Sequence, residues 1–200
     1  MLEKKTNKPV RDKALWDEAL KESPVIAAVR SEETLESALA SPVRLVYLLF
    51  GNPMNLERMI AAARSRKKLL LVNADLLQGF SRDAYAVEYL AHCDASGIIS
   101  THHGTLQAAR THGLITVLRT FMIDSAAVEG AKRFLAHFQP DAVELLPAIA
   151  APVVLDSIRE AHPTLKVIAG GLISDLKQVE SLVQAGVDAV SLSRPGLWVV

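Results

Sequence analysis

Short apolar runs alternate with amphipathic stretches along nearly the whole chain. Eight runs rich in Val, Ile and Leu stand at residues 25–29, 45–50, 69–72, 97–100, 114–118, 142–146, 166–170 and 188–192. Each run is too short for a typical helix, and its apolar character is continuous rather than alternating. This pattern is typical of parallel strands that are buried on both faces.

The stretches between these runs repeat their apolar residues at helical spacing. Most of them begin with a side chain suited to the N-cap position, namely Ser31, Asn55, Asp83, Asp124 or Ser174. Gly186 is placed to end the last of these helices, just before the eighth run. An additional helix, at about residues 11–22, precedes the first run.

Eight strands that alternate with helices predict an α/β protein with a parallel sheet. We expect a compact single-domain TIM-type (β/α) barrel, because closure of the sheet leaves no edge strand. Residues 1–23 then form a tail and an extra helix, and residues 24–200 form the barrel. Few residues follow the eighth run, so the eighth helix is expected to be missing or replaced by the N-terminal helix. A doubly wound open sheet is the competing architecture, but its Gly-x-Gly-x-x-Gly fingerprint does not follow the first strand.

Composition removes several classes of protein. The 22 acidic and 22 basic residues balance, which argues against a polyelectrolyte surface but not against a local basic patch. Cys93 is the single cysteine, which excludes an intrachain disulfide, and no zinc-type Cys/His spacing is present. The first thirteen residues lack the apolar stretch of a secretory signal, and no apolar run approaches the roughly 18 residues of a membrane span. We therefore expect a cytoplasmic protein without a membrane partner.

Functional groups of a (β/α) barrel lie at the carboxyl ends of its strands. The residues expected there are Arg30, Asn73, Asp75, Thr101, His102, His103, Arg119, Glu144, Gly170, Gly171, Ser193 and Arg194. Arg119 and Glu144 stand within apolar sequence, where an unpaired charge is strongly unfavourable. They are expected to pair with each other, or with a ligand, in the barrel mouth.

The loops after the seventh and eighth strands predict a site for phosphate or another small anion. Gly170 and Gly171 allow backbone amides to approach an anion closely, and a helix begins shortly after them. Ser193 and Arg194 end the eighth strand, where a guanidinium adds a charged fork. Two glycines alone also fit an ordinary tight turn, so the prediction of an anion site rests on the two loops together.

Catalytic groups are harder to identify. A Schiff-base lysine would lie inside the barrel, but Lys68 and Lys166 begin their strands and no strand interior contains lysine. A metal site would need both mouth histidines and a carboxylate, and we expect none. Asp75 and Glu144 suit either acid/base catalysis or the binding of hydroxyl groups. Because no nucleophile is evident, no catalytic residue is assigned.

Six motifs follow one another along the chain: NADLLQG (73–79), GIISTHH (97–103), LRTFMIDSAAVE (118–129), QPDAVELLP (139–147), IAGGLI (168–173) and AVSLSRPGLW (189–198). In this order they resemble the glycerol-3-phosphate-responsive antiterminator family (GlpP), over essentially residues 24–198. The resemblance implies a compact TIM-type barrel that regulates glycerol uptake and metabolism operons. With glycerol-3-phosphate bound, such a protein acts on the leader mRNA so that transcription passes a terminator.

The resemblance also implies roles for the mouth residues, with glycerol-3-phosphate as effector and no cofactor. The phosphate is expected at Gly170, Gly171, Ser193 and Arg194. The glycerol hydroxyls are expected at Asp75 and Glu144, supported by Asn73, Arg119 and Arg30. Thr101, His102 and His103 are further contacts at the mouth, although the family pattern has a basic residue such as arginine where His102 stands.

RNA binding is not evident from composition alone, because the chain is neutral and carries few aromatic residues. Basic residues gather only at 64–68 and within 4–13, and both stretches also fit solvated chain segments. An RNA surface is therefore expected to involve more than one subunit, as in a homodimer, or a loop that the ligand orders. The alternative functions are a small phosphate-sugar isomerase or synthase, with Asp75 or Glu144 as base, and a barrel that serves only as an interaction scaffold.

Overall fold

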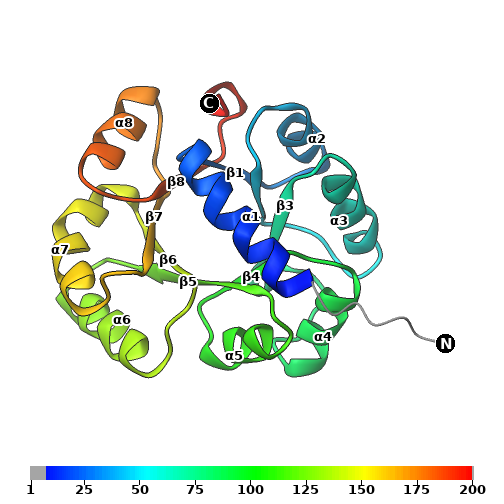
Figure 1. The fold of residues 1–200 in the computed structure, drawn as a ribbon, viewed down its shortest axis with the longest axis horizontal. Helices are drawn as coiled ribbons and strands as arrows, with labels where there is room; N and C mark the ends of the chain where they lie inside the picture. Colours follow the sequence, from blue (N-terminus) through cyan, green and yellow to red (C-terminus); the bar gives the residue numbers. More distant parts are fainter. Residues whose placement is uncertain (1–7, 200) are drawn as a thin grey trace.

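Eight parallel strands form one closed barrel in the order β1 to β8, with β8 paired to β1 (Figure 1). The computed structural model describes residues 8–199, and their side chains from Asp12 onward. The strands are β1 (Val25–Val29), β2 (Leu45–Leu48), β3 (Leu69–Asn73), β4 (Gly97–Ser100), β5 (Ile115–Phe121), β6 (Ala142–Leu146), β7 (Lys166–Gly170) and β8 (Ala189–Leu192). Closure confirms the predicted barrel and excludes the doubly wound open sheet.

One α-helix follows each of the first seven strands and lies on the outside of the barrel (Figure 1). These helices are α2 (Glu32–Ala40), α3 (Leu56–Ser65), α4 (Ala84–His92), α5 (His103–Thr111), α6 (Ser125–His137), α7 (Ala151–Ala161) and α8 (Leu176–Gln184). Short 3₁₀ turns stand at η1 (Ala74–Leu76), η2 (Ala148–Ala150) and η3 (Pro195–Leu197). Among residues 8–199, no helix combines the length and the apolar character needed to cross a membrane.

The strands separate two apolar cores. Residues that point into the barrel, such as Ile26 and Ile168, form an inner core. Their neighbours in sequence, such as Ala27 and Val167, pack against the surrounding helices in an outer core. Because both faces of every strand are buried, the strands are continuous apolar runs rather than alternating ones.

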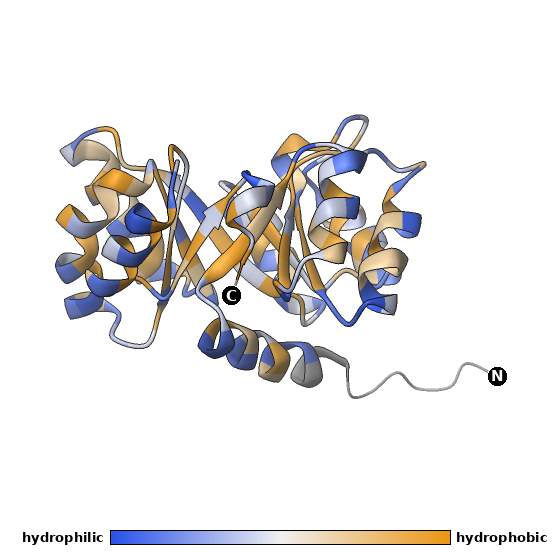
Figure 2. Ribbon diagram, turned by 90° about the horizontal axis from the view of Figure 1, so that it is seen from above, coloured by the Kyte–Doolittle hydropathy of each residue, from blue (hydrophilic) through white to orange (hydrophobic). Residues whose placement is uncertain are grey.

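The N-terminal helix α1 (Lys8–Glu22) closes the amino-terminal end of the barrel. Figure 2 shows it below the strands, and Trp16, Ala19 and Leu20 belong to the inner core together with Leu45 and Leu69. The indole of Trp16 therefore fills the amino-terminal end of the barrel interior. Helix α1 covers this end and is not part of the outer ring of helices.

The eighth position of the outer ring holds no α-helix in the described part of the chain. The turn η3 follows β8 and packs beside α2. It brings in Trp198, which is buried and donates a hydrogen bond of 2.9 Å from indole Nε1 to the carbonyl of Leu192. Of the two alternatives predicted for the eighth helix, its absence is the one observed.

Most predicted helix starts are confirmed. The side chains of Ser31, Asp83 and Asp124 each accept a hydrogen bond from the backbone amide three residues further on. Asn55 also stands at the N-cap, of α3, but its side chain accepts from the amide of Asn52 instead. The short polar side chains thus begin the helices, as their N-cap preference predicts.

Two boundaries differ from the prediction. Ser174 is not the N-cap of α8; Asp175 is, since its carboxylate accepts from the amide of Gln178 at 3.0 Å. Ser174 turns to the side chain of Gln178 instead. Strand β5 continues to Phe121, so Arg119 lies within a strand rather than at its end.

Candidate functional site

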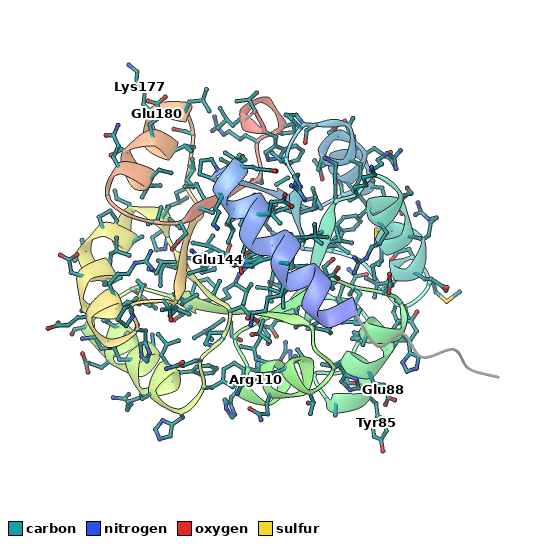
Figure 3. All side chains as sticks on the ribbon, in the orientation of Figure 1. Tyr85, Glu88, Arg110, Glu144, Lys177 and Glu180 are labelled. Atoms are coloured by element: carbon teal, nitrogen blue, oxygen red, sulfur yellow. The ribbon has the colours of Figure 1, made fainter. Side chains whose placement is uncertain are left out.

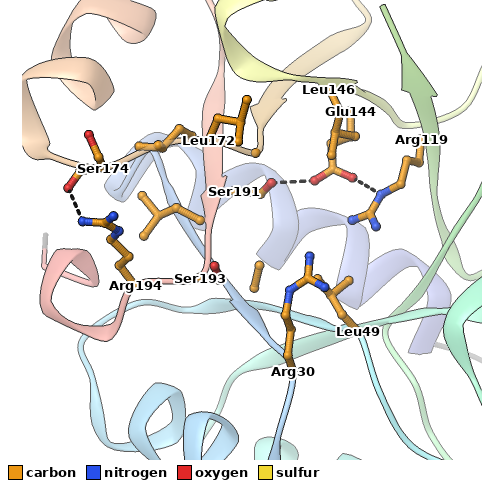
Figure 4. A pocket seen from close by; sticks show the side chains of 14 residues that line it. Arg30, Leu49, Arg119, Glu144, Leu146, Leu172, Ser174, Ser191, Ser193 and Arg194 are labelled. Atoms are coloured by element: carbon orange, nitrogen blue, oxygen red, sulfur yellow. Dashed lines mark hydrogen bonds and ion pairs between the residues drawn. The ribbon is translucent and has the colours of Figure 1, made fainter.

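A cavity of about 380 Å³ opens at the carboxyl end of the barrel (Figure 4). Strands β1, β5, β6 and β8 and residues that follow β1, β2, β7 and β8 surround it. Its charged and hydroxyl-bearing residues are Arg30, Arg119, Glu144, Ser174, Ser191, Ser193 and Arg194. The cavity thus lies where strand-end residues of a barrel converge.

Glu144 is the central acid of this cavity and is almost fully buried, with 1% of its surface exposed. It faces Arg119 across the β5–β6 ladder. One carboxylate oxygen accepts a hydrogen bond of 2.6 Å from Arg119 Nε, and the other accepts one of 2.5 Å from Ser191 Oγ (Figure 4). An unpaired charge at this depth would be strongly unfavourable, so Arg119 and Glu144 each need a partner. They are partners of each other, which is one of the two predicted arrangements.

Tyr47 lies inside the barrel and is completely buried. Its hydroxyl has no hydrogen-bond partner among the described residues. Burial raises the pKa of Tyr47 well above its usual value; the charge of Glu144 adds to the rise and that of Arg119 opposes it. The phenol therefore stays protonated. Sequence reasoning missed this residue because a tyrosine within an apolar run is indistinguishable from core.

Gly170 is required by the carboxylate beside it. A Cβ at this position would lie 2.5 Å from Ser191 Oγ and 2.9 Å from Glu144 Oε1. Both separations are far below an ordinary van der Waals contact, so only glycine leaves room for the buried pair. The sequence predicted an approach of backbone to anion at this glycine, and the anion that approaches it here is the protein's own carboxylate.

The loop after β7 has two successive residues in the left-handed region, Gly171 at φ 81° and Leu172 at φ 61°. Both line the cavity. Glycine adopts this conformation freely, whereas a bulky residue such as leucine is an outlier there. Such strain is characteristic of functional loops.

Arg30 and Arg194 give the cavity an excess of positive charge. Neither has a carboxylate partner among the described residues, and Arg194 donates one hydrogen bond of 3.0 Å to the carbonyl of Ser174 (Figure 4). The lining contains three guanidinium groups and one carboxylate, which is already paired with Arg119. The arrangement is suited to a small dianion such as a phosphate monoester.

Asp75 does not line this cavity. Its carboxylate accepts from Ser100 Oγ and from the backbone amide of Thr101, both at 2.7 Å, and from Thr101 Oγ1 at 3.0 Å. Burial raises the pKa of Asp75, but these hydrogen bonds and nearby His102 outweigh it, so the pKa is lowered overall. Asn73 in turn accepts from the amide of Asp75. The predicted pair Asn73 and Asp75 thus ties the end of β3 to the end of β4.

The remaining mouth residues lie around the ends of β4 and α5. His102 is the N-cap residue of α5, and its Nδ1 lies 3.3 Å from Asp75 Oδ1. His103 packs edge-on against the rings of Phe134 and Phe138. Among the described residues, no group of three or more His, Cys, Asp or Glu side chains is arranged to hold a metal ion.

Ser191 lines the cavity and contacts its central acid, but strand-end reasoning did not select it. It lies within β8, where it bonds to Glu144, and two residues before Ser193. Alternate residues of a strand point to the same face, so Ser191 is expected on the same side as Ser193. This spacing, with a hydroxyl inside an apolar run, was the indication in the sequence that Ser191 belongs to the site.

Comparison with known proteins gives consistent results. The family model described as "Glycerol-3-phosphate responsive antiterminator" matches residues 25–198. The glycerol uptake operon antiterminator regulatory protein of Listeria monocytogenes is 32% identical and has a solved structure with a TM-score of 0.81, covering 87% of this chain and 94% of that one. An antiterminator-related protein of Thermotoga maritima is 28% identical with a TM-score of 0.79, covering 88% and 98%. The resemblance predicted from the motifs is thereby confirmed.

Two further comparisons carry less functional information. The uncharacterized protein YgcP of Escherichia coli K12 is 32% identical over 183 residues, which are 90% of this chain and 93% of that protein. Orotidine 5'-phosphate decarboxylase of Pyrococcus horikoshii has a TM-score of 0.62 at 14% identity. At that identity the likeness supports the barrel fold alone.

Proposed function

The chain belongs to the glycerol-3-phosphate responsive antiterminator family, and from this premise we propose that its mouth cavity binds glycerol-3-phosphate and that occupancy controls its action on leader RNA. The observation that carries the proposal is the surplus of guanidinium groups in a cavity of about 380 Å³. A small phosphate monoester brings two negative charges and a polar tail. It matches both the charge and the size of this space.

The orientation of the ligand follows from where the charges lie. We assign the phosphate to the side formed by Gly171, Ser193, Arg194 and Arg30, since the free guanidinium groups are there. The glycerol end then reaches Ser191 and the Arg119–Glu144 pair at the floor. Asp75 and Asn73 are assigned a supporting role, because their oxygens already accept hydrogen bonds from the ends of β3 and β4.

The hydrogen bonds of Glu144, the acid of the cavity, are consistent with a ligand that is bound but not converted. Glu144 accepts from both Arg119 and Ser191, so it is not free to act as a base. Lys68 and Lys166 bond to groups at the amino-terminal end of the barrel. The matching family and the Listeria relative are described as regulators, which supports a regulator rather than a phosphate-sugar isomerase or synthase.

The basic stretch at residues 64–68 is largely engaged within the protein. Arg64 pairs with Asp12, Arg66 lies 3.5 Å from Glu36, and Lys68 donates to backbone carbonyls. Of the basic residues in the other stretch, within residues 4–13, only Lys13 has a described side chain, and it pairs with Asp141. We therefore propose that the response to ligand reaches the RNA through the loops of the mouth. An action on nascent transcripts places the protein in the cytoplasm.

Isothermal titration with glycerol-3-phosphate tests the binding proposal, with glycerol and inorganic phosphate as reference ligands. We expect saturable binding much tighter than either reference, and the recovered ligand unchanged. Arg194→Gln and Arg30→Gln should each weaken binding by at least about tenfold, as expected for loss of a charge-assisted contact. Arg58→Gln, which removes an exposed pair with Glu32, is the matched control.

Gel-shift measurements with a leader RNA of a glycerol operon test the second half of the proposal. Glycerol-3-phosphate should change the affinity of the wild-type protein for this RNA and leave that of Arg194→Gln unchanged at the same ligand concentration. Absence of glycerol-3-phosphate binding at millimolar concentration would contradict the pocket. Binding without any effect on RNA would contradict only the coupling.

A further inference from the structure

Six large apolar side chains are exposed on three consecutive loops at the carboxyl end of the barrel. They are Phe121 and Ile123 at and after the end of β5, Ile149 in η2 and Val153 in the first turn of α7, and Leu172 after β7 and Leu176 at the start of α8. Four of them, Ile123, Ile149, Val153 and Leu172, expose between 79% and 84% of their surfaces. We call these six residues the apolar crescent. It occupies the β5–β7 side of the mouth.

The extent of the apolar crescent exceeds what a monomer ordinarily leaves in water. Side chains of this size and exposure add up to roughly 600–800 Å² of apolar surface. The largest apolar patch of a typical monomer is about 300–600 Å², and each partner of a standard protein interface contributes roughly 800 Å². The apolar crescent alone thus approaches one side of a stable interface.

The charge of this region argues against RNA as its occupant. Residues 120–131, 146–158 and 171–176 contain neither lysine nor arginine. They contain four acids, Asp124, Glu129, Asp156 and Asp175, of which Asp124 and Asp175 accept backbone amides as helix N-caps. Lys132, Arg133, Arg159 and Lys177 follow directly after these segments, but the segments themselves carry only acids, which disfavours phosphates. A surface of the same apolar character would instead exclude water from the whole crescent.

A hollow beside the crescent makes the same face self-complementary. A cavity of about 290 Å³ lies between β5 and α6, with Phe121, Ala127, Gly130 and Phe134 in its wall. Thr101, Arg119 and Thr120 also line it. Protruding apolar side chains and a mainly apolar recess on one face are the two halves that a two-fold interface needs. We propose that a second copy of this chain covers the apolar crescent in a symmetric dimer.

Leu172 links this interface to the ligand cavity. It lines the cavity, projects into the crescent and has a left-handed backbone conformation. A ligand that fixes the loop at Gly171 and Leu172 therefore also fixes one contact of the dimer, so glycerol-3-phosphate strengthens dimerisation. This linkage rests on the proposed function, whereas the dimer itself does not.

Sedimentation velocity of the full chain, at about 1–100 µM with and without glycerol-3-phosphate, tests the dimer. The wild-type protein should sediment as two 21.7 kDa chains. Ile149→Asp and Val153→Asp should each raise the dimer dissociation constant by at least about 30-fold, because a charge would be buried at the interface. Tyr85→Asp is the control: it changes an equally exposed side chain on α4, on the far side of the molecule from α8 (Figure 3). Circular dichroism establishes that each variant is folded.

The outcomes separate the alternatives. A wild-type monomer at 100 µM in both conditions, or a dimer that survives Ile149→Asp and Val153→Asp, overturns the interface. A monomer whose leader-RNA affinity falls in the same two variants overturns it as well and assigns the crescent to RNA. Titration with glycerol-3-phosphate runs in parallel: a dimer that binds no ligand supports the interface and contradicts the proposed function alone.

Discussion

The two ends of the barrel hold cavities of equal volume, about 380 Å³ each, but their charges are paired differently. At the amino-terminal end, Lys13 lies 2.5 Å from Asp141, and Lys166 lies 3.0 Å from Asp188. At the carboxyl end, Arg30 and Arg194 have no carboxylate partner among the described residues. Size therefore does not distinguish a ligand site from a structural recess in this molecule. The unbalanced charge does.

The acids of the amino-terminal end are satisfied by the chain itself. Asp188 accepts from the backbone amide of Val167 at 2.8 Å and from Arg159 and Lys166. Asp141 accepts from both the amide and the hydroxyl of Thr116 at 2.9 Å. Polar groups that are fully satisfied within the fold stabilise it, and this end of a barrel is where stability residues are expected.

The largest effect is expected at the buried pair of the mouth. Glu144→Ala leaves Arg119 buried without its partner, which should lower the free energy of unfolding by about 3–5 kcal/mol. The double variant Arg119→Met/Glu144→Leu should recover most of that loss but should not recover glycerol-3-phosphate binding. Urea unfolding and titration measure the two effects. A double variant that binds ligand as the wild type does would remove the pair from the site.

At the opposite end, Asp188→Ala should lower the free energy of unfolding by about 2–4 kcal/mol, because three donors lose their acceptor. Its affinity for glycerol-3-phosphate should stay within about twofold of wild type, as expected for a site at the other end of the barrel. Glu180→Ala, an exposed position on α8 (Figure 3), is the stability control. Loss of ligand affinity in a still-stable Asp188→Ala protein would contradict the division between the two ends.

The close approach at Gly170 gives a smaller and more local effect. Gly170→Ala brings a methyl group against Ser191 Oγ and Glu144 Oε1. Overpacking of this kind should lower the free energy of unfolding by about 1–3 kcal/mol. Adding Ser191→Ala removes the nearest oxygen and should recover part of the loss. If Gly170→Ala is as stable as the wild type, the packing argument for this glycine is wrong.

The smallest effect is a dependence on pH. Burial raises the pKa of Asp188, but hydrogen bonds from Val167, Lys166 and Arg159 outweigh it and hold the pKa below its usual value. Ionised Asp188 therefore stabilises the fold above the ordinary aspartate pKa of about 3.9, and this stabilisation is lost as pH falls through the folded value. Urea unfolding between pH 6 and acid conditions should show the difference between wild type and Asp188→Asn shrinking below about pH 4. A difference that grows on acidification would reverse the assigned sign.

The strands were predictable because burial on both faces leaves a continuous apolar signal in the sequence. A charge within such a run, as at Arg119 and Glu144, is equally visible, since it needs a partner. The position of α1 was not predictable. Its apolar face, with Trp16, packs against residues from several strands. The sequence of the helix itself does not indicate which end of the barrel this face covers.

The residues that line the cavity were predictable only in part. The strand ends identify the residues at the mouth of the barrel, but the loop conformations decide which of these residues line the same cavity. Asp75 follows β3 as Arg30 follows β1, yet its carboxylate turns to Ser100 and Thr101 rather than to the cavity lined by Arg30. The apolar crescent was also invisible in sequence, since exposed leucine and isoleucine in loops look like core until the loops are placed together.

A crystal structure of the protein with glycerol-3-phosphate would show which of the two cavities holds the ligand. We expect phosphate oxygens within hydrogen-bond distance of Arg194 and Arg30, beside Gly171 and Ser193, with the hydroxyls directed toward Ser191. Phosphate bound instead in the amino-terminal cavity, beside Lys13 and Lys166, would contradict the claim that unbalanced charge marks the site.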